Sequence, residues 1–402
     1  MALSEHVIAW PLLVLNIGAL VLVLMYAAQI LASLLPQKEN GSIKPNAAGP
    51  VAILVPAHDE ETGIGATLMA IRAAMAPGDR LLVVADNCSD KTAIIARAAG
   101  AEVIERHDPS RRGKGFALDA GIRHIALSPP AVVIIVDADC FPERQALSWL
   151  TAAASNSGRP TQSLYLMTSP ADAPLSTKVS EFAFSLKNKV RQRGLHRLGL
   201  PCHLTGSGMA FPWATISTLD LADGHLAEDM KMGLNLALAG HPPLFCERAV
   251  VLSAFPETMT GLATQRGRWI KGHITLISTA LRALPTALYQ GKLAAALAAV
   301  ATAIPPLTVF ILLLGLLFAI SLIASLLAEA ALPAVLVAFF NLTVAMAMTF
   351  VAWVKFGQEI LPPRAAMRAV WLILTRLASA PLNLARTRTS SWIRTDRSRS
   401  GE

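Results

Sequence analysis

Carboxylate side chains follow three apolar segments in the middle of the chain, and their positions predict a metal site. Asp137 and Asp139 form a D-x-D directly after the run VVIIV. Asp86 follows LLVVA, and Glu60 lies just beyond VAILV. Carboxylates gathered in one cleft repel each other unless a cation joins them. Because oxygen ligands of this kind suit Mg²⁺ or Mn²⁺ with substrate phosphates, we expect Asp139 and Asp137 to bind a divalent metal.

The elements that would position these residues lie between residues 48 and 256. Near-continuous apolar runs predict strands at 51–55, 81–85, 102–104 and 132–136, with helical patterns between them at about 61–75, 90–99 and 114–126. Strands of this kind are buried on both faces, as in parallel sheets. The order predicts an α/β fold with a doubly wound, mostly parallel sheet. Ligands of such sheets bind beyond the carboxyl ends of the strands, so the carboxylates should meet at one edge.

Several other classes of site are excluded. No G-x-G-x-x-G or G-x-x-x-x-G-K-[ST] loop follows a predicted strand, which counts against a dinucleotide-dependent oxidoreductase and a P-loop NTPase. A metal held by the D-x-D is then the remaining way to neutralise a diphosphate. The four cysteines include no C-x-x-C pair, which argues against a disulfide framework and a zinc site. Aromatic residues make up 6% without basic interleaving, so no nucleic-acid module is expected.

The composition indicates a membrane protein. Only 15% of the 402 residues are charged, against about 25% in soluble proteins, and the mean hydropathy is +0.49. Three uncharged stretches are long enough to span a bilayer, namely Val7–Leu35, 306–327 and the 25 residues between Glu329 and Lys355. A signal peptide is the alternative for the first stretch, but no basic residue precedes it. Residues 293–304, before Pro305-Pro306, are expected to form an interfacial approach helix.

Basic residues set the expected orientation. Lys38 and Lys44 follow the first span, so the N-terminus is expected outside a bacterial-type inner membrane and the middle of the chain in the cytosol. Residues 367–385 are interpreted as an interfacial helix, with a fourth span as the alternative. The expected division is 1–37 for the first transmembrane helix, 48–256 for the cytosolic domain, 257–291 for an interfacial amphipathic region, 292–354 for a transmembrane hairpin and 355–402 for an interfacial helix and basic tail.

Seven motifs occur in an order and spacing that resembles a known family. They are VPAHDEE, VVADNCSD, RRGKGFAL, VVIIVDADC, HLTGSGMAF, HLAEDMKMG and QRGRW. Over roughly residues 48–285 the chain resembles the family-2 inverting glycosyltransferases with a GT-A fold. Within that family it is similar to the membrane-embedded bacterial synthases of poly-N-acetylglucosamine, hyaluronan, chitin and cellulose. The resemblance implies a UDP-sugar donor, a divalent metal, and a saccharide or lipid-linked acceptor.

The resemblance also implies roles for individual residues. The nucleotide-sugar would contact Pro56, Ala57, Glu60, Asp86, Lys114, Asp137 and Arg268, with Asp86 at the uracil. The acceptor would contact Gln265, Trp269, Gly206 and Ser207. Asp229, from the Glu228-Asp229 pair, would be the catalytic base, because inverting transfer needs one group to take the acceptor hydroxyl proton. A helix predicted at 226–239 would help to keep that carboxylate ionised.

Simpler alternatives exist for several of these residues. The Glu228-Asp229 pair could be only a favourable first-turn pair, Trp269 a membrane-interface anchor, and 206–208 an ordinary turn rather than a flexible loop near the acceptor. Asp90 is expected to be a helix cap and not a ligand. A basic run could contact anionic lipid or a lipid-linked diphosphate, or could be a solvated helix face; it comprises Lys187, Lys189, Arg191, Arg193 and Arg197.

The chain departs from the family pattern at three places. Ala85 stands before Asp86 where an Asp pair is usual, Ala227 replaces the usual Thr before Glu228-Asp229, and Asp59 replaces the commoner Asn. The departures at Ala85 and Ala227 are the only support for a non-enzymatic scaffold or sensor. We expect a membrane-bound transferase that extends a β-linked polysaccharide, a hypothesis that depends on Q-x-x-R-W. Single-sugar transfer to a polyprenyl phosphate or glycolipid is the alternative, because three spans leave little room for export without a partner subunit or oligomer.

Overall fold

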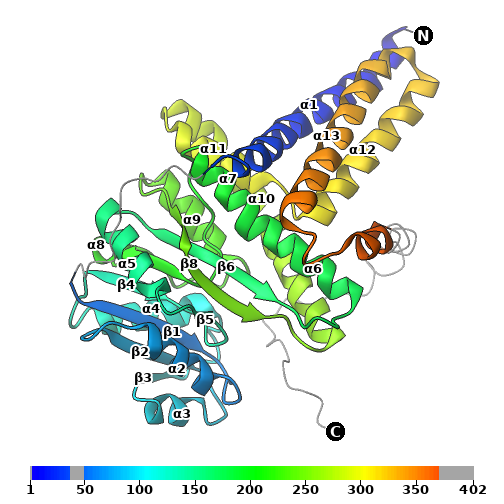
Figure 1. Ribbon diagram of the computed structural model, residues 1–402. Coiled ribbons are helices and arrows are strands. Elements are labelled where there is room, and N and C mark those ends of the chain that lie inside the picture. The colour runs from blue at the N-terminus through cyan, green and yellow to red at the C-terminus, as the bar shows by residue number, and fades with distance from the viewer. Residues whose placement is uncertain (1, 37–48, 371–402) are drawn as a thin grey trace.

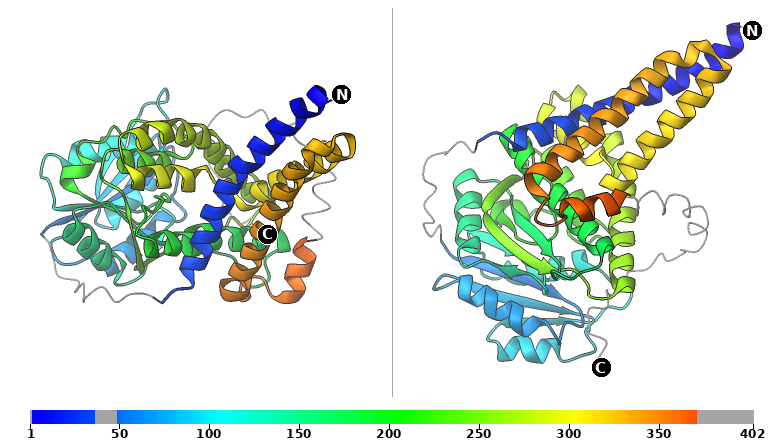
Figure 2. Two further views of the ribbon diagram at one scale, coloured as in Figure 1. Left: turned by 90° about the horizontal axis from the view of Figure 1, so that it is seen from above. Right: turned by 45° about the vertical axis from the view of Figure 1, so that its right-hand side comes forward.

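The computed structural model describes residues 2–36 and 49–370, in which a mixed α/β domain adjoins a bundle of three long helices (Figure 1). Lys38, Lys44 and most of the predicted helix at 367–385 lie outside the described residues, as does the basic tail. Two further views show the helices projecting together from one side of the domain (Figure 2).

An eight-stranded sheet forms the centre of the domain, in the order β3-β2-β1-β4-β7-β6-β8-β5. The strands are β1 (Val51–Ala57), β2 (Arg80–Asp86), β3 (Glu102–Arg106), β4 (Val132–Ile135), β5 (Phe141–Pro142), β6 (Thr161–Thr168), β7 (Met209–Pro212) and β8 (Leu244–Ala254). The four predicted strands are present and parallel. β7 is antiparallel to both β4 and β6, and β5 is antiparallel to β8, so the complete sheet is mixed.

Helices cover both faces of the sheet. They are α2 (Ile64–Ala74), α3 (Thr92–Ala98), α4 (Lys114–Ile125), α5 (Ala146–Ser157), α8 (Trp213–Ile216) and α9 (Glu228–Leu238). In β1, Ile53 and Val55 pack on the side of α2 and α5, whereas Ala52 and Leu54 pack on the side of α4 and α9. Burial of both faces explains why the strand is a continuous apolar run in the sequence.

The sheet opens at the carboxyl ends of β1 and β4. β1 pairs with β2 on one side and with β4 on the other, so the strand order reverses at this pair. The pairing with β4 ends at Leu54 and Ile135. Pro56, which has no backbone N–H to donate, lies just beyond it. Such a reversal leaves a crevice outside the strand ends, which is where open α/β sheets bind ligands.

A long helical segment connects the domain to the bundle. It consists of α6 (Leu175–Ser185), a π-helix η1 (Leu186–Arg191) and α7 (Gln192–Arg197), which follow one another without a break. Two more helices, α10 (Met259–Tyr289) and α11 (Leu293–Ala303), lie against α9 at the same boundary (Figure 1). Single π-helical turns inside α-helices often occur at functional sites.

The three predicted spans form α1 (Ala2–Ser33), α12 (Leu307–Leu327) and α13 (Leu332–Phe356), with a 3₁₀ turn at Glu329–Ala331. In the described part of the chain, these are the helices long and apolar enough to cross a membrane. Side chains fill the interior of the bundle: the rings of Tyr26 and Phe310 are 5.8 Å apart, and Asn16 Nδ2 donates to Ser321 Oγ at 3.1 Å.

Candidate active site

One cavity of about 420 Å³ connects the open edge of the sheet with the base of the helix bundle. At the sheet end its wall includes Asp86 and Asp137, and at the other end it includes Tyr26 of α1 and Phe310 of α12. Most of the predicted site residues line it, namely Pro56, Ala57, Glu60, Asp86, Lys114, Asp137, Asp139, Gly206, Glu228, Asp229, Gln265, Arg268 and Trp269. Ser207 is the exception.

The D-x-D after β4 has the chemistry of a divalent-metal site. Possible ligand atoms of Asp137, Asp139 and Cys140 lie within 4.8 Å of one another. Burial raises the pKa of the Cys140 thiol to about 12, and its S–H donates to Asp139 Oδ1 at 3.3 Å. The thiol therefore stays protonated as a donor, and the two carboxylates remain as the oxygen ligands that suit Mg²⁺ or Mn²⁺.

Lys114 places a cation beside the metal site. It is the first residue of α4, and its Nζ lies 2.5 Å from Asp137 Oδ1 and donates to the Gly206 carbonyl oxygen at 2.6 Å. Burial alone lowers the pKa of Lys114, but the carboxylates of Asp137, Glu228 and Asp229 outweigh it and raise the pKa above its ordinary value. The ammonium therefore stays charged, in reach of an anion bound at the D-x-D.

Glu228 and Asp229 form the opposite wall, in the first turn of α9. Asp229 lies near the D-x-D, because a Cβ atom added to Gly206 would be 3.3 Å from Asp229 Oδ2 and 3.8 Å from Asp137 Oδ2. Burial and the neighbouring Asp229 raise the pKa of Glu228 to about 7. Burial also raises the pKa of Asp229, although Lys187 and Lys114 oppose it.

The turn at 206–208 is a buried support and not a flexible loop. Gly206 has φ +96°, a conformation that a residue with Cβ rarely adopts, and its carbonyl oxygen faces Lys114. Ser207 is fully buried, and its Oγ accepts a hydrogen bond from the Asp137 backbone N–H at 3.1 Å. The prediction that Ser207 contacts the acceptor is therefore wrong: this side chain lies behind the cavity wall and positions Asp137.

Asp86 lies at the sheet end of the cavity, as the sequence predicts. Its Oδ1 accepts hydrogen bonds from Arg106 Nη1 at 2.6 Å and from Asn87 Nδ2 at 3.0 Å. Arg106 lies on the neighbouring strand β3, directly across from Asp86. Arg106 thus balances the charge of Asp86, the one carboxylate at the place where an Asp pair is usual. The contact of Asp86 with the uracil base stays a prediction.

The Q-x-x-R-W residues lie on one face of α10, since positions three and four apart in a helix are neighbours. Gln265 is 2% exposed and its Oε1 has no hydrogen-bond partner, so it can accept one from a ligand. The ring of Trp269 packs against Phe184 of α6 with centroids 5.4 Å apart. Trp269 therefore forms part of the cavity wall on the domain core, which disfavours its interpretation as a membrane anchor.

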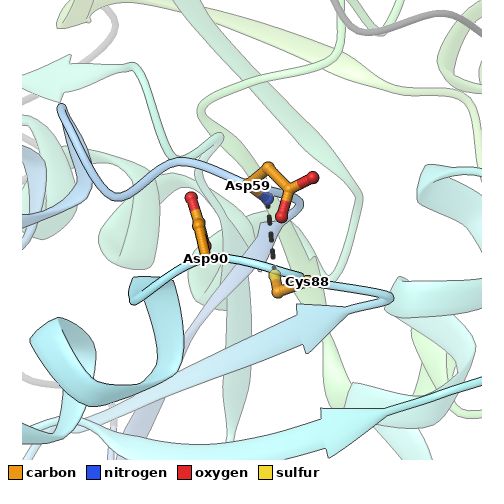
Figure 3. Close-up of side chains that lie close together, drawn as sticks. All are labelled: Asp59, Cys88 and Asp90. Atoms are coloured by element: carbon orange, nitrogen blue, oxygen red, sulfur yellow. Dashed lines mark hydrogen bonds between the residues drawn. The ribbon is translucent and has the colours of Figure 1, made fainter.

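A second acidic group lies outside the cavity and serves the fold. Figure 3 shows Asp59, Cys88 and Asp90 close together in the loops after β1 and β2. Asp59 Oδ1 accepts from the Ser89 backbone N–H, and Asp90 accepts from the backbone N–H groups of Glu61 and Thr92. Since their oxygens join the two loops, this group is structural. Asp90 lies just before Lys91, the N-cap of α3, and accepts from the N–H of the first helical residue, Thr92.

The basic run is not a solvated helix face. Lys187 and Arg191, both in η1, line the cavity. Arg191 Nε donates to Gln29 Oε1 of α1 at 2.6 Å, Arg193 pairs with Glu247, and Arg197 donates to the Ser33 carbonyl oxygen. Arg191 and Arg197 thus hold α1 against the domain, which the spacing of the run could not reveal.

Several cavity residues carried no signal in the sequence. His273 of α10 lines the cavity, and its Nε2 donates to the Thr302 carbonyl oxygen at 2.9 Å. Burial and the field of Lys187 lower the pKa of His273 to about 3, so the ring is neutral. Tyr26 and Phe184 also line the cavity, although they lie far apart in the sequence and neither belongs to a motif.

Comparisons with known sequences match the domain that carries this cavity. A family model described as "Glycosyltransferase like family 2" matches residues 48–272. The probable glycosyltransferase YdaM of Bacillus subtilis is 28% identical over 235 residues, which are 56% of this chain and 55% of YdaM. Glucosyl-3-phosphoglycerate synthase of Mycolicibacterium paratuberculosis is 36% identical over 108 residues, which are 25% of this chain and 32% of that protein. The chain thus spans about half or less of the length of these relatives.

A solved structure shares the fold over most of the chain. The mannosyltransferase PcManGT from Pyrobaculum calidifontis, solved in complex with GDP-Man and Mn²⁺, superposes with a TM-score of 0.55 at 19% sequence identity. The superposition covers 87% of this chain and 98% of PcManGT. At this level of identity the likeness concerns the fold, and the match includes more than the α/β domain.

Proposed function

Since the chain belongs to glycosyltransferase family 2 and is a sugar-transferring enzyme, we propose that it joins a sugar from a UDP-sugar to an acceptor anchored in a membrane. One observation carries this proposal: a single cavity extends from the D-x-D after β4 to the ends of the membrane-type helices α1 and α12. A donor at the sheet edge and an acceptor entering beside the bundle would meet between Asp137 and Asp229. An enzyme acting only on soluble substrates has no need of a cavity that reaches the membrane-type helices.

Asp229 is the group that we propose as general base. It would take the proton of the acceptor hydroxyl, whose oxygen attacks the anomeric carbon as the bond to the nucleoside diphosphate breaks. The electron pair of that bond leaves with the diphosphate, and the configuration at the anomeric carbon inverts. A positioned base of this kind contributes about 10²- to 10⁴-fold to the rate. Burial raises the pKa of Asp229, and with it the proton affinity that a base needs, while Lys187 and Lys114 favour its ionised form.

The leaving diphosphate would be held by cations on the other wall. Lys114 lies beside Asp137, and Arg268 projects from α10 as a planar fork that suits phosphate oxygens. A divalent metal held by Asp137 and Asp139 would supply further positive charge to the diphosphate when bound. Pro56, Ala57, Glu60 and Asp86 would form the nucleotide end of the pocket.

A lipid-linked saccharide is the acceptor that the geometry favours. Side chains fill the interior of the described bundle, where Asn341 Nδ2 also donates to the Asn16 carbonyl oxygen at 2.9 Å. A growing polysaccharide therefore has no passage along the bundle in the described part of the chain. A lipid could instead lie beside the helices and present its saccharide to the cavity.

Polysaccharide extension is the second candidate, and one observation favours it. Gln265, Arg268 and Trp269 line the cavity together, with the Trp269 ring forming part of its wall. An aromatic ring of this kind can stack against the terminal sugar of a chain. Export of the polymer would then require an oligomer or a partner subunit.

The products distinguish these acceptors. Membranes containing the full chain should be incubated with Mn²⁺ and a panel of radiolabelled UDP-sugars, with GDP-mannose for comparison. We expect a labelled product that organic solvent extracts as a glycosylated lipid, made from a UDP-sugar. A labelled high-mass polymer would replace the lipid acceptor with the polysaccharide. Turnover of GDP-mannose alone would show that the assigned nucleotide is wrong.

A further inference from the structure

The membrane end of the cavity contains cations without acidic partners. Lys187 and Arg191 of η1 both line it. Among residues 2–36 and 49–370, no salt bridge joins either side chain to a carboxylate. Arg191 is 5% exposed, and its guanidinium donates to two neutral oxygens, those of the Gln29 side chain and the Ala301 backbone at 3.1 Å. A buried cation held only by neutral groups is costly unless an anion joins it.

Polar atoms around these cations are also left without partners. Asn188, the next residue after Lys187, is 2% exposed, lines the cavity, and has an Oδ1 with no hydrogen-bond partner. Gln29 Nε2 is likewise buried and unpaired. An amide can present either its oxygen or its nitrogen to a ligand. Because buried polar atoms are nearly always satisfied, this end of the cavity has the features of a site that a ligand completes.

The electric field there is positive. Burial lowers the pKa of His203 and of His273, and Lys187 and Arg191 lower both further. Burial lowers the pKa of Lys187 itself; Asp229 opposes this, and Arg191 adds to it. Asp229 thus attracts Lys187 without forming an ion pair with it. A ligand that suits such surroundings carries negative charge.

The cations lie near the end of a candidate membrane span, which indicates that the anion belongs to a lipid. Arg191 bonds to Gln29, in the last two turns of the candidate span Val7–Ser33, so it lies at the level where lipid phosphates are found. The neighbouring wall is apolar and comprises Tyr26, Ile304, Pro305, Pro306, Leu307 and Phe310. These residues come from α1 and from the segment that enters α12.

We infer that this end of the cavity is a subsite for the phosphate that links a lipid to its saccharide, with Lys187, Arg191 and Asn188 as the binding groups. The lipid chain would leave past the apolar segment that enters α12 and lie beside the bundle, not in its packed interior. The saccharide would extend from the phosphate toward Asp229, which lies next to Lys187. This inference rests on the proposed function and names the acceptor as a phosphate-linked lipid.

Equilibrium binding tests the subsite independently of sugar transfer. The full chain in phosphatidylcholine nanodiscs should be titrated with farnesyl diphosphate in the absence of metal and donor, with UDP present to occupy the nucleotide pocket. Charge-assisted hydrogen bonds predict saturable binding about tenfold or more tighter than that of farnesol. Inorganic pyrophosphate should compete only at concentrations about tenfold higher or more, because it lacks the apolar chain.

Lys187→Met should weaken farnesyl diphosphate binding by about tenfold or more, since it removes the charge and retains the shape. Lys189→Met is the matched control, because Lys189 belongs to the same π-helix but does not line the cavity. Its affinity should stay within about twofold of the unaltered chain. If Lys187→Met does not fold, the comparison of farnesyl diphosphate with farnesol on the unaltered chain decides the question.

The outcomes separate this inference from the proposed function. Equal affinity for farnesol and farnesyl diphosphate, or an unchanged affinity in a folded Lys187→Met variant, would overturn the subsite. Equal affinity for inorganic pyrophosphate would show that it accepts a free anion and not a lipid. Binding as expected, together with a transfer assay that yields no glycosylated lipid, would reject the proposed function and leave the subsite in place.

Discussion

Asp229 and Glu228 are adjacent in the first turn of α9 but have different surroundings. Asp229 lies near Gly206 and the D-x-D and is attracted by Lys187 and Lys114, which favour its ionised form. The pKa of Glu228 rises to about 7, chiefly through burial and then through the charge of Asp229. Two carboxylates with different surroundings are suited to different roles, and we propose Asp229 as the base.

Asp229→Asn should therefore lower kcat by about 10²- to 10⁴-fold, because it removes the base and retains the shape. Binding of the UDP-sugar, measured by calorimetry, should change little, since Asp229 does not hold the nucleotide. Glu228→Gln is the matched control and should retain more activity than Asp229→Asn. The opposite ranking would transfer the role of base to Glu228.

The shared charge of this pair predicts a pH dependence. Burial raises both pKa values: Glu228 gains a proton as the pH falls through about 7, and Asp229 gains one as the pH falls further, so kcat/KM should decline as the pH falls below neutrality. In Glu228→Gln the titration of Glu228 is absent, so the acid limb should move to lower pH. A pH–rate profile of both proteins tests this, and an acid limb at the same pH in the variant would contradict it.

Asp139→Asn should weaken the metal dependence of turnover, because an amide oxygen is a poorer ligand for a hard cation than a carboxylate. The Mn²⁺ concentration that gives half-maximal activity should rise, and EDTA should abolish activity in both proteins. Asp119→Asn, on the outer part of α4 and outside the cavity, is a suitable control. An unchanged Mn²⁺ requirement in Asp139→Asn would remove Asp139 from the metal site.

At the scale of elements, the junction of α7 with α1 fixes the position of the α/β domain relative to the candidate span α1. Gly194 of α7 contacts α1 so closely that an added Cβ atom would lie 1.9 Å from the Gln29 carbonyl oxygen. Arg191 and Arg197, on either side of it, both donate hydrogen bonds to α1. The same junction thus holds the first span and forms one wall of the cavity.

Gly194→Ala should lower the free energy of unfolding by about 1–3 kcal/mol, because the backbone at this contact cannot make room. Gly267→Ala, in α10 with no atom within 4 Å of the added Cβ, is the control and should stabilise by up to about 1 kcal/mol. Thermal unfolding in detergent measures both. Equal melting temperatures for the two variants would refute the close contact.

At the scale of the molecule, the distribution of basic residues predicts that the α12–α13 turn faces away from the cytosol and the α/β domain faces the cytosol. A membrane-impermeant maleimide should therefore label Glu329→Cys in intact cells. Arg111→Cys, at an exposed position of the α/β domain, should be labelled only after permeabilisation. The reverse pattern would invert the proposed topology and place the donor site on the wrong side for cytosolic UDP-sugars.

Features that depend on local sequence were predictable. β1, β2 and β4 are almost entirely apolar because both of their faces are buried, whereas the edge strand β3 is partly exposed and carries charged residues. Asp86, Asp137 and Asp139 lie at one edge because parallel strands end together. The three long uncharged helices follow from the cost of charge in a bilayer. Alternation of apolar runs with turn residues thus determined the fold class, the edge that holds the carboxylates and the candidate spans.

Tertiary structure alone decided which distant segments share the cavity. Ser207 belongs to a motif but is buried behind Asp137, whereas Tyr26 and His273 belong to none and line the wall. From the sequence, the basic run was also compatible with a solvated helix face, yet Lys187 and Arg191 of η1 line the cavity. Such placements arise from packing between helices far apart in the chain, where the energy depends on contacts that no local pattern encodes.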